Sequence, residues 1–463
     1  MPASFDWRGF LTEFKGQAGF DRAAGILERP HEADQPLEPL DVAGMQQSPG
    51  MCAEVLSERW PAVLRSLRNP NFRLFWAGNF LSNIGTWMQN VAQGWLVLTL
   101  TNSAFWLGVV GFAGAIPFLF FTLFGGVIAD RVNKRRLLLV TQTTMMILAF
   151  VLAGLTYLHR ITVLEIVVLA FLNGTAGAMN TPSYQAMVPK LVPREDLTNA
   201  IALNSAQFNM SRILGPMLGG YAMVAFGVAG NFFLNALSFL TVLAALLRIR
   251  YPEEELVRHE GLVSSLGSGF RYVRSRPQME VLIWMIAVAS FLTIPFLTFI
   301  PYFAKIQLNA GESGLGLLLA ASGTGAVLGA AAVAWKGSRG SLRYRGRIIA
   351  FCGAGVMAVV VAFCYSQSFL MSEVCMFLEG VGMILTISSV NVAMQQLSSD
   401  AMRGRVMSIY ATCFLGLPPL GALMAGELSR HIPTTHALAL MAGISSLAFL
   451  GFFVSSPALR SLD

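Results

Sequence analysis

The sequence predicts an all-α integral membrane protein with twelve transmembrane helices in two bundles of six and with both termini in the cytoplasm. Three observations lead to this prediction: the composition, the spacing of the apolar runs and the distribution of the basic residues. The 463 residues are 55% hydrophobic and 12% charged, whereas soluble domains are about 25% charged. A chain this long and this apolar buries its surface in lipid rather than in one water-soluble core.

Twelve apolar runs account for the predicted helices. Each run is about 20 residues long, which is enough for an α-helix to cross the hydrocarbon layer of a bilayer. The runs cover residues 74–99, 103–127, 136–158, 162–182, 199–226, 229–248, 280–303, 312–335, 347–366, 369–395, 404–427 and 435–455. One long polar connection follows the sixth run and divides the chain into two halves.

This division predicts the domain organisation. We expect a polar, disordered cytoplasmic tail over residues 1–67, a six-helix bundle over 68–250, a cytoplasmic linker over 251–279, a second six-helix bundle over 280–456 and a short tail over 457–463. The first tail has no apolar segment of the kind found in secretory signals. Its natural start is either Met1 or a later methionine, Met45 or Met51.

The basic residues predict the orientation of the helices. With the N-terminus inside, 24 lysines and arginines fall on the cytoplasmic side and three fall on the other side, namely Arg160, Lys305 and Arg430. Cytoplasmic loops are enriched in lysine and arginine, so both termini are predicted to be cytoplasmic. The basic residues lie singly or in short clusters at the ends of apolar runs, which argues against nucleic-acid binding despite a net charge of +7.

Motifs of catalysis and metal binding are missing from the sequence. The five cysteines show no C-x-x-C spacing, and the five histidines lie outside the cores of the apolar runs. We find no H-E-x-x-H, P-loop or G-x-S-x-G motif. We therefore expect no metal, no cofactor and no enzymatic activity.

The two halves repeat each other at an offset of about 210 residues. The glycine-dotted run 101–121 corresponds to 310–332, and GPMLGG at 215–220 corresponds to LPPLGA at 417–422. Duplication of a six-helix unit is typical of transporters, in which two bundles rock about a central site.

The stretch GGVIADRVNKRRLLLV, residues 125–140, places five charges in a gap barely long enough for a turn. Its lysine and arginines anchor two helix ends at the cytoplasmic face. Acidic residues contribute little to membrane orientation, so Asp130 needs another explanation. An aspartate at the end of one helix, beside Arg131 and close to the next helix, suggests a charge cluster that fastens neighbouring parts together.

This hairpin resembles the signature of the major facilitator superfamily, G-x-x-x-D-R/K-x-G-x-R/K-R/K, which is matched by Gly126, Asp130, Arg131, Arg135 and Arg136. Asn133 stands where glycine is usual, and because asparagine tolerates the left-handed backbone conformation, we expect the turn to form. The corresponding loop of the second half keeps basic residues but has no aspartate. The resemblance implies that Asp130 clamps the halves together at the cytoplasmic side when the protein faces outward.

A second motif concerns the direction of transport. SRILGPMLGG at residues 211–220 resembles the G-P-x-x-G-G element of the drug:proton antiporters and other exporters of the superfamily. Pro216 removes a helix hydrogen bond and bends the span. Gly215, Gly219 and Gly220 let a neighbouring helix approach closely. A packing kink without a role in transport is the alternative reading.

Three further stretches resemble the enterobactin-exporter-like branch of the superfamily, the transmembrane secretion effectors. They are RNPNFRLFWAGNFLSNIGTWM at the first span, NTPSYQAMVPKLVPREDLTNAIALNS after the fourth and RGRVMSIY before the eleventh. The resemblance covers about residues 68–455 and leaves residues 1–60 unmatched.

Polar side chains within the spans are the candidates for a substrate site. In the first span five of them recur at intervals of 4, 3, 4 and 3 on one helical stripe: Asn79, Asn83, Thr86, Asn90 and Gln93. Such a stripe avoids lipid and faces a cavity or another helix. The resemblance implies a cavity, because the first, fourth, seventh and tenth spans line it in this fold. Asn173 and Asn180 in the fourth span are further candidates.

Arg212 and Glu379 are the charges deepest within apolar runs. A lone charge there is costly, so such residues pair with each other, bind substrate or carry protons. Arg212 is a candidate for the cavity, with structural pairing as the alternative. Glu379 is the candidate for proton coupling, because it is the one carboxylate deep in a span and burial favours its neutral form.

These features predict a proton-coupled exporter of a small, partly apolar molecule such as a siderophore or a drug, in the inner (cytoplasmic) membrane. Its expected partners are that molecule, protons and lipid, and it is expected to act as a monomer. An importer of a small metabolite with the same fold is one alternative, and a non-transporting membrane receptor or enzyme is another.

Overall fold

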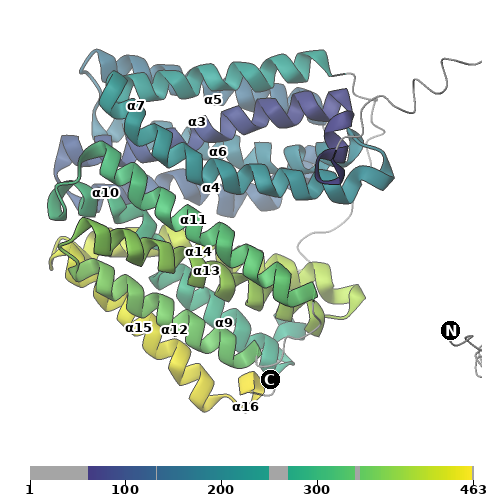
Figure 1. The fold of residues 1–463 in the computed structure, drawn as a ribbon, viewed down its shortest axis with the longest axis vertical. Helices are drawn as coiled ribbons and strands as arrows, with labels where there is room; N and C mark the ends of the chain where they lie inside the picture. Colours follow the sequence, from purple (N-terminus) through teal and green to yellow (C-terminus); the bar gives the residue numbers. More distant parts are fainter. Residues whose placement is uncertain (1–60, 132, 250–269, 339–344, 461–463) are drawn as a thin grey trace, which may run out of the picture. The chain divides into compact units, whose positions relative to one another are not determined.

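The computed structural model describes residues 61–131, 133–249, 270–338 and 345–460, and for residues 62, 121–131, 335–338, 345 and 401 it describes the helix without the side chains. The described part is all-helical (Figure 1). The long helices before the linker are α3 (Pro70–Thr101), α4 (Ala104–Arg131), α5 (Lys134–Tyr157), α6 (Val163–Met187) and α7 (Leu197–Arg248). The helices after it are α9 (Pro277–Leu292), α10 (Ile300–Tyr302), α11 (Gly311–Ser338), α12 (Arg345–Tyr365), α13 (Phe369–Leu397), α14 (Asp400–Leu428), α15 (Thr434–Ser455) and α16 (Pro457–Arg460).

Helix α7 consists of two legs that meet at Gly227. This glycine has φ 71° and ψ 175°, a conformation that side chains with a Cβ rarely adopt. The chain therefore reverses here with almost no loop. The predicted runs 199–226 and 229–248 correspond to these two legs.

The segment after the linker is broken in the middle by prolines. Helix α9 ends at Leu292 and is followed by a 3-10 helix, η6 (Ile294–Phe299), by α10 and by a π-helical turn, η7 (Phe303–Gln307). Pro295 and Pro301 lack the N–H that a regular α-helix needs. Irregular helical turns of this kind are frequent at functional sites.

The helices pack in two groups that follow the two halves of the sequence (Figure 1). The N-terminal half comprises α3 to α7, and the C-terminal half comprises α9 to α16. Two helix crossings join the halves: α4 packs on α14, and the first leg of α7 packs on α11. Each crossing pairs the second helix of one half with the fifth helix of the other, so the segments that repeat in the sequence occupy equivalent positions.

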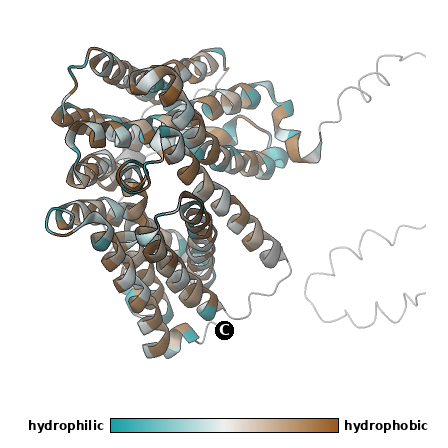
Figure 2. Cartoon of the chain, turned by 60° about the vertical axis from the view of Figure 1, so that its left-hand side comes forward, coloured by the Kyte–Doolittle hydropathy of each residue, from teal (hydrophilic) through white to brown (hydrophobic). Residues whose placement is uncertain are grey.

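The surfaces of the helices are apolar, and the polar residues gather at their ends (Figure 2). Large apolar side chains such as Leu164, Leu447 and Val454 are more than 60% exposed, which suits lipid and not water. In the described part of the chain, nine helical segments are long and apolar enough to cross a membrane. Helix α3 is not among them, because its polar stripe lowers its hydropathy.

The structure corrects the predicted boundary of the N-terminal tail. Residues Ala62–Arg68 form a 3-10 helix, η3, that packs on the bundle and is not disordered. Arg65 Nε lies 2.8 Å from Asp196 Oδ1, and Ser66 Oγ donates to the Asp196 carbonyl over 2.9 Å. Leu67 is buried beside them. Arg65 thus forms an ion pair within the protein, which a count of charges does not reveal.

The predicted linker is also shorter than expected. Residues 270–274 are helical, and α9 begins at Pro277. Arg276 donates to the Leu397 carbonyl over 3.1 Å, so this part of the linker is tied to the end of α13. The expected disorder of residues 1–60 lies outside the described residues.

Candidate substrate cavity

A cavity of about 520 Å³ lies between the two halves. Its wall is built by α3, α4, α6 and the first leg of α7 on one side and by η6, α10 and α11 on the other, with Met145 of α5 at the edge. Apolar residues such as Trp87, Leu107 and Phe118 cover much of this wall. A cavity of this size, mostly apolar and with a few polar groups, suits a small organic molecule.

The N-terminal half supplies most of the polar groups of the wall. They are Thr86, Asn90 and Gln93 of α3, Asn173 of α6 and Arg212 of α7. The structure thus brings five of the eight sequence-predicted cavity residues to one site. All three residues of α3 come from the C-terminal part of the polar stripe.

The other three predicted cavity residues are not in the wall that the described residues form. Asn79 is buried and donates to the Phe75 carbonyl of its own helix over 2.8 Å. Asn83 is half-buried outside the lining. Asn180 accepts hydrogen bonds from Thr141 Oγ1 at 3.0 Å and Gln142 Nε2 at 3.2 Å. Its amide therefore joins α6 to α5, because this face of α6 is turned away from the cavity.

Glu379 of α13 is buried behind the wall and does not line the cavity. The exposed fractions of Glu379 and Ser322 are both 2%. Ser322 of α11 donates its hydroxyl to Glu379 Oε2 over 2.7 Å and also forms part of the cavity wall. The positive charge of Arg212 acts on the Glu379 carboxylate, although among the described residues no hydrogen bond or ion pair joins the two. Arg212 and Ser322 are therefore the two lining residues that interact with Glu379.

Ser322 could not be singled out from the sequence alone. Serine is common in membrane helices, and its contact with Glu379 depends on how α11 and α13 are rotated against each other. Close packing sets this rotation: a Cβ on Gly325 would overlap the Phe377 carbonyl, and one on Gly380 would overlap the carbonyl of Ser322. The available signal in the sequence is a glycine-rich span together with a lone carboxylate deep in another span. Such a pair indicates that the two helices pack closely and that the carboxylate has a partner there.

The G-P-x-x-G-G element packs against two helices at once. A Cβ on Gly215 would overlap Trp87 of α3, and a Cβ on Gly219 would lie 3.0 Å from Met88 Cα. A Cβ on Gly220 would lie 2.7 Å from the Glu312 carbonyl oxygen of α11. Pro216 lies in the cavity wall. The element thus holds α7 close both to its own half and to the opposite one.

Substitution of Gly220 tests this packing. Because a Cβ there meets backbone and not a flexible side chain, we expect Gly220→Ala to lower the stability of the purified protein by about 1–3 kcal/mol and to separate α7 from α11. Gly154→Ala is the control, since a Cβ on Gly154 meets nothing within 4 Å. Thermal unfolding of both variants checks the prediction. Equal midpoints for Gly220→Ala and Gly154→Ala would contradict it.

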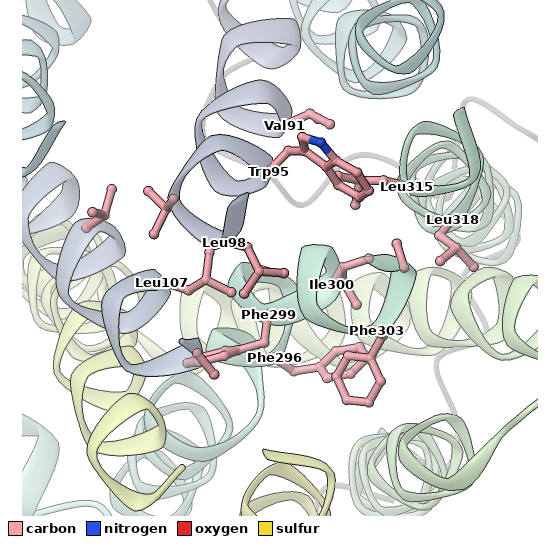
Figure 3. Packing of buried hydrophobic residues seen from close by; sticks show 14 of the residues in the cluster. Val91, Trp95, Leu98, Leu107, Phe296, Phe299, Ile300, Phe303, Leu315 and Leu318 are labelled. Atoms are coloured by element: carbon pink, nitrogen blue, oxygen red, sulfur yellow. The ribbon is translucent and has the colours of Figure 1, made fainter. Parts of the chain in front are cut away.

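One end of the bundle is closed by contacts between the halves. We call it the charge-poor end, because Arg160, Lys305 and Arg430 are its only lysines or arginines in the predicted topology. Here Val91, Trp95 and Leu98 of α3 share one buried apolar cluster with side chains of the other half (Figure 3). Those side chains include Phe296, Phe299, Ile300, Leu315 and Leu318.

Two cations of the C-terminal half lie over aromatic rings of the N-terminal half at this end. Lys305 Nζ is 5.4 Å from the centre of the Trp95 ring and donates to Thr99 Oγ1 over 2.8 Å. The guanidinium of Arg430 is 5.1 Å from the centre of the Phe105 ring. Cations and aromatic faces attract each other at such distances. We refer to these two contacts together as the cation–π clasp.

The charged hairpin is described only in part. Gly126, Asp130 and Arg131 lie on α4 where the side chains are outside the described residues. Arg135 donates to the carbonyls of Leu246 and Leu247 over 2.7 and 3.0 Å. Arg135 therefore caps the end of α7 within its own half. Arg136 is exposed.

Asn133 does not take the left-handed conformation whose tolerance was the reason for expecting the turn. Asn133 has φ −57°, and its side chain accepts a hydrogen bond from the backbone N–H of Arg136 at the start of α5. Asparagine at this position thus works as a helix N-cap. The need to satisfy the first N–H groups of α5 outweighs the tolerance of asparagine for positive φ.

Comparisons with known proteins agree with this architecture. The model of the family described as transmembrane secretion effector matches residues 62–463. The staphyloferrin A transporter of Staphylococcus aureus is 31% identical over 176 residues, a match that covers 38% of this chain and 44% of that protein. The multidrug efflux pump Tap of Mycolicibacterium fortuitum is 27% identical over 391 residues, covering 82% of this chain and 94% of the pump.

Two further similarities extend over most of the chain. The enterobactin exporter EntS of Citrobacter koseri is 27% identical over 406 residues, covering 85% of this chain and 92% of EntS. The crystal structure of the nucleoside transporter NupG superposes with a TM-score of 0.66 at 14% identity, covering 83% of this chain and 99% of NupG, which shows the shared fold. The chain belongs to the transmembrane secretion effector family of the major facilitator superfamily, and it is a multi-pass membrane transporter and not an enzyme.

Proposed function

We propose that this transporter exports a small, partly apolar molecule, siderophore-like or drug-like, from the cytoplasm in exchange for protons. The observation that carries this proposal is the cavity between the halves, with amides and one arginine on one wall and a buried carboxylate behind the other. The relatives named as efflux pump and enterobactin exporter support the direction. The glycines of the G-P-x-x-G-G element, packed across both halves, support it as well.

We further propose twelve spans with both termini in the cytoplasm of a bacterial cell, in its inner membrane. The nine candidate segments include α7, whose two legs on either side of Gly227 each have the length of a span. Adding α3 and α4 gives twelve. The excess of lysine and arginine at one end of the bundle supports the orientation. The two halves of one chain supply both walls of the cavity, which supports a monomer as the working unit.

Transport in this architecture requires the two halves to open alternately toward each side of the membrane. With the proposed orientation, the apolar cluster and the cation–π clasp close the outer end in the described state. The clasp uses two of the three cations at an end where cations are scarce. Opening to the outside must break these contacts, and so their strength sets the balance between the two states.

Removing the clasp is expected to open the charge-poor end. Lys305→Met combined with Arg430→Met keeps long side chains but deletes both charges. Two contacts of about 1 kcal/mol each correspond to a roughly thirtyfold shift toward the outward-open state. Pulsed electron paramagnetic resonance between spin labels at Leu158 and Leu370, exposed positions on the two halves, measures the shift in a protein whose native cysteines have been replaced.

Arg160→Met is the matched control for the clasp. Arg160 is exposed and lies at the same predicted end of the membrane, and no contact of its side chain with the C-terminal half is found among the described residues. Its loss changes the local charge without touching the clasp. A double variant that keeps the distance distribution of the wild type, or an Arg160→Met protein that opens equally, would rule out the clasp as a closing device.

Two other functions remain open to test. An importer of a small metabolite has the same fold and the same cavity, and it would move its substrate in the opposite direction under the same gradient. A non-transporting receptor would bind a ligand in the cavity without moving it. The accumulation of a panel of dyes and siderophores in cells with and without the protein separates the three. Lower accumulation supports export, higher accumulation supports import, and equal accumulation contradicts both kinds of transport.

A further inference from the structure

The position of Glu379 poses a question for proton coupling. Its carboxylate is 2% exposed and has no place in the cavity wall. A substrate in the cavity therefore does not touch the group that is proposed to carry the proton. Ser322 lies between them, because its hydroxyl bonds Glu379 Oε2 over 2.7 Å and the residue itself belongs to the wall.

A serine hydroxyl has one proton to donate and two lone pairs with which to accept. When Glu379 is ionised, the carboxylate only accepts, and so the proton of Ser322 is committed to it. The serine oxygen can then only accept from the cavity side. When Glu379 is protonated, the carboxyl O–H donates to Ser322 Oγ and frees the proton of the serine. Ser322, a residue of the cavity wall, thus has a hydroxyl proton to donate only when Glu379 is protonated.

We propose that Ser322 couples the cavity to Glu379 by this reversal, and that the transported molecule presents a hydroxyl or amine donor to Ser322. The proposal rests on the proton-coupled export proposed above. The reversal also supplies a proton path: a proton arriving from the cavity binds Ser322 Oγ, while the original serine proton passes to Glu379 Oε2. Ser322 belongs to the cavity wall although only 2% of its surface is exposed, so the proposed contact requires a small substrate group.

The sign of the coupling follows from this geometry. A substrate donor binds Ser322 better while Glu379 is ionised, because after protonation the carboxyl O–H occupies one of the two serine lone pairs, so substrate binding and proton binding oppose each other. Linkage is reciprocal, and therefore binding of the substrate favours release of the proton. This opposition is what exchange of a substrate for a proton requires.

The position of Arg212 argues against an anionic substrate. This residue lines the cavity, and its charge interacts with Glu379. An anionic substrate would compete with the ionised carboxylate for Arg212 and would favour protonation of Glu379. Such a molecule would travel together with a proton and not against it. Among the described residues, Arg212 from α7 and Ser322 from α11 are the groups that act on Glu379, while α12 presents the apolar Val356 beside Gly382 of α13.

Binding of two matched probes tests the reversal. The probe 7-amino-4-methylcoumarin carries an uncharged aromatic amine, and 4-methylcoumarin has no donor. Equilibrium dialysis against the full chain in lipid nanodiscs measures both affinities from mildly alkaline to mildly acidic pH. The affinity for the amino probe is expected to fall by up to about tenfold per pH unit as Glu379 takes up its proton. The affinity for 4-methylcoumarin is expected to stay constant.

Single substitutions test whether the Ser322 hydroxyl causes this pH dependence. Ser322→Ala is expected to abolish it, and Ser322→Thr to restore it. Thr298→Val removes another hydroxyl of the cavity wall and is expected to keep the same pH slope, whatever its effect on affinity. A slope that survives in Ser322→Ala would overturn the proposal. So would equal slopes for the two probes, or an amino-probe affinity that rises as the pH falls.

Infrared spectroscopy of the ligand-free protein tests the proposal even if neither probe binds. The carboxyl band that appears on acidification and is missing in Glu379→Gln reports Glu379. Loss of the bond to Ser322 is expected to shift this band in Ser322→Ala, while Thr298→Val leaves it in place. An unshifted band overturns the role of Ser322 alone. The absence of any Glu379 band in the wild type overturns proton coupling through Glu379 itself, so the two failures are distinct.

Discussion

Glu379→Gln is expected to abolish uphill export while still permitting downhill exchange, with weaker binding of substrates that donate to Ser322. Glutamine has the shape of the protonated carboxyl group and cannot ionise, so it holds the buried site in its neutral form. The 2.7 Å contact with Ser322 persists through the amide. Proteoliposomes with an imposed pH gradient measure the effect, and uphill transport is expected to fall to the level of protein-free vesicles.

Glu373→Gln is the control for this substitution. Glu373 lies on the same helix, six residues before Glu379, and is less buried. Its change removes a carboxylate from α13 without touching Ser322 or Arg212, and uphill transport is expected to continue. Vesicles with Glu379→Gln that still pump uphill would show that Glu379 has a structural role only.

Asp130→Asn is expected to slow transport by about tenfold at unchanged membrane abundance. The substitution keeps the apolar length of α4, so insertion into the membrane is preserved. It removes the one acid of the charged hairpin, which the family resemblance assigns to a clamp on the cytoplasmic side. A clamp worth about 1.4 kcal/mol changes the balance of inward and outward states by a factor of ten. Initial rates of substrate efflux, normalised to protein abundance, measure the change.

Asp400→Asn provides the comparison on the same predicted side of the membrane. Asp400 starts α14 and pairs with Arg403 at 2.7 Å, but its side chain is 91% exposed. Exposed pairs of this kind contribute little, so transport is expected to stay near the wild-type rate. A well-expressed Asp130→Asn protein that transports as fast as Asp400→Asn would count against the clamp.

The course of the chain through its helices was predictable from the sequence, because apolar length and charge placement act locally. The break at Gly227 separates two runs that the sequence already showed as 199–226 and 229–248. The start of α15 at Thr434 lies one residue from the predicted start of the last run. Local signals of this kind need no knowledge of neighbouring helices.

It was harder to predict which face of each helix points into the cavity, because tertiary packing decides how each helix is rotated. Asn90 and Asn180 have the same side chain within predicted spans, yet one lines the cavity and the other bonds α5. Glu379 was identified from its depth alone, but its separation from the cavity by Ser322 depends on the rotation of α11 against α13. The closing contacts of Lys305 and Arg430 likewise join residues more than 200 positions apart.

Export driven by a proton gradient is the central claim, and one measurement tests it most directly. Purified wild-type protein is reconstituted in vesicles with a dye that accumulates less in cells containing the protein, and a pH gradient is imposed. We predict that the dye moves against its own concentration gradient, toward the side with more protons, and that a protonophore stops the movement at once. Dye movement that only equalises the two concentrations, or uphill movement that survives the protonophore, would contradict the account.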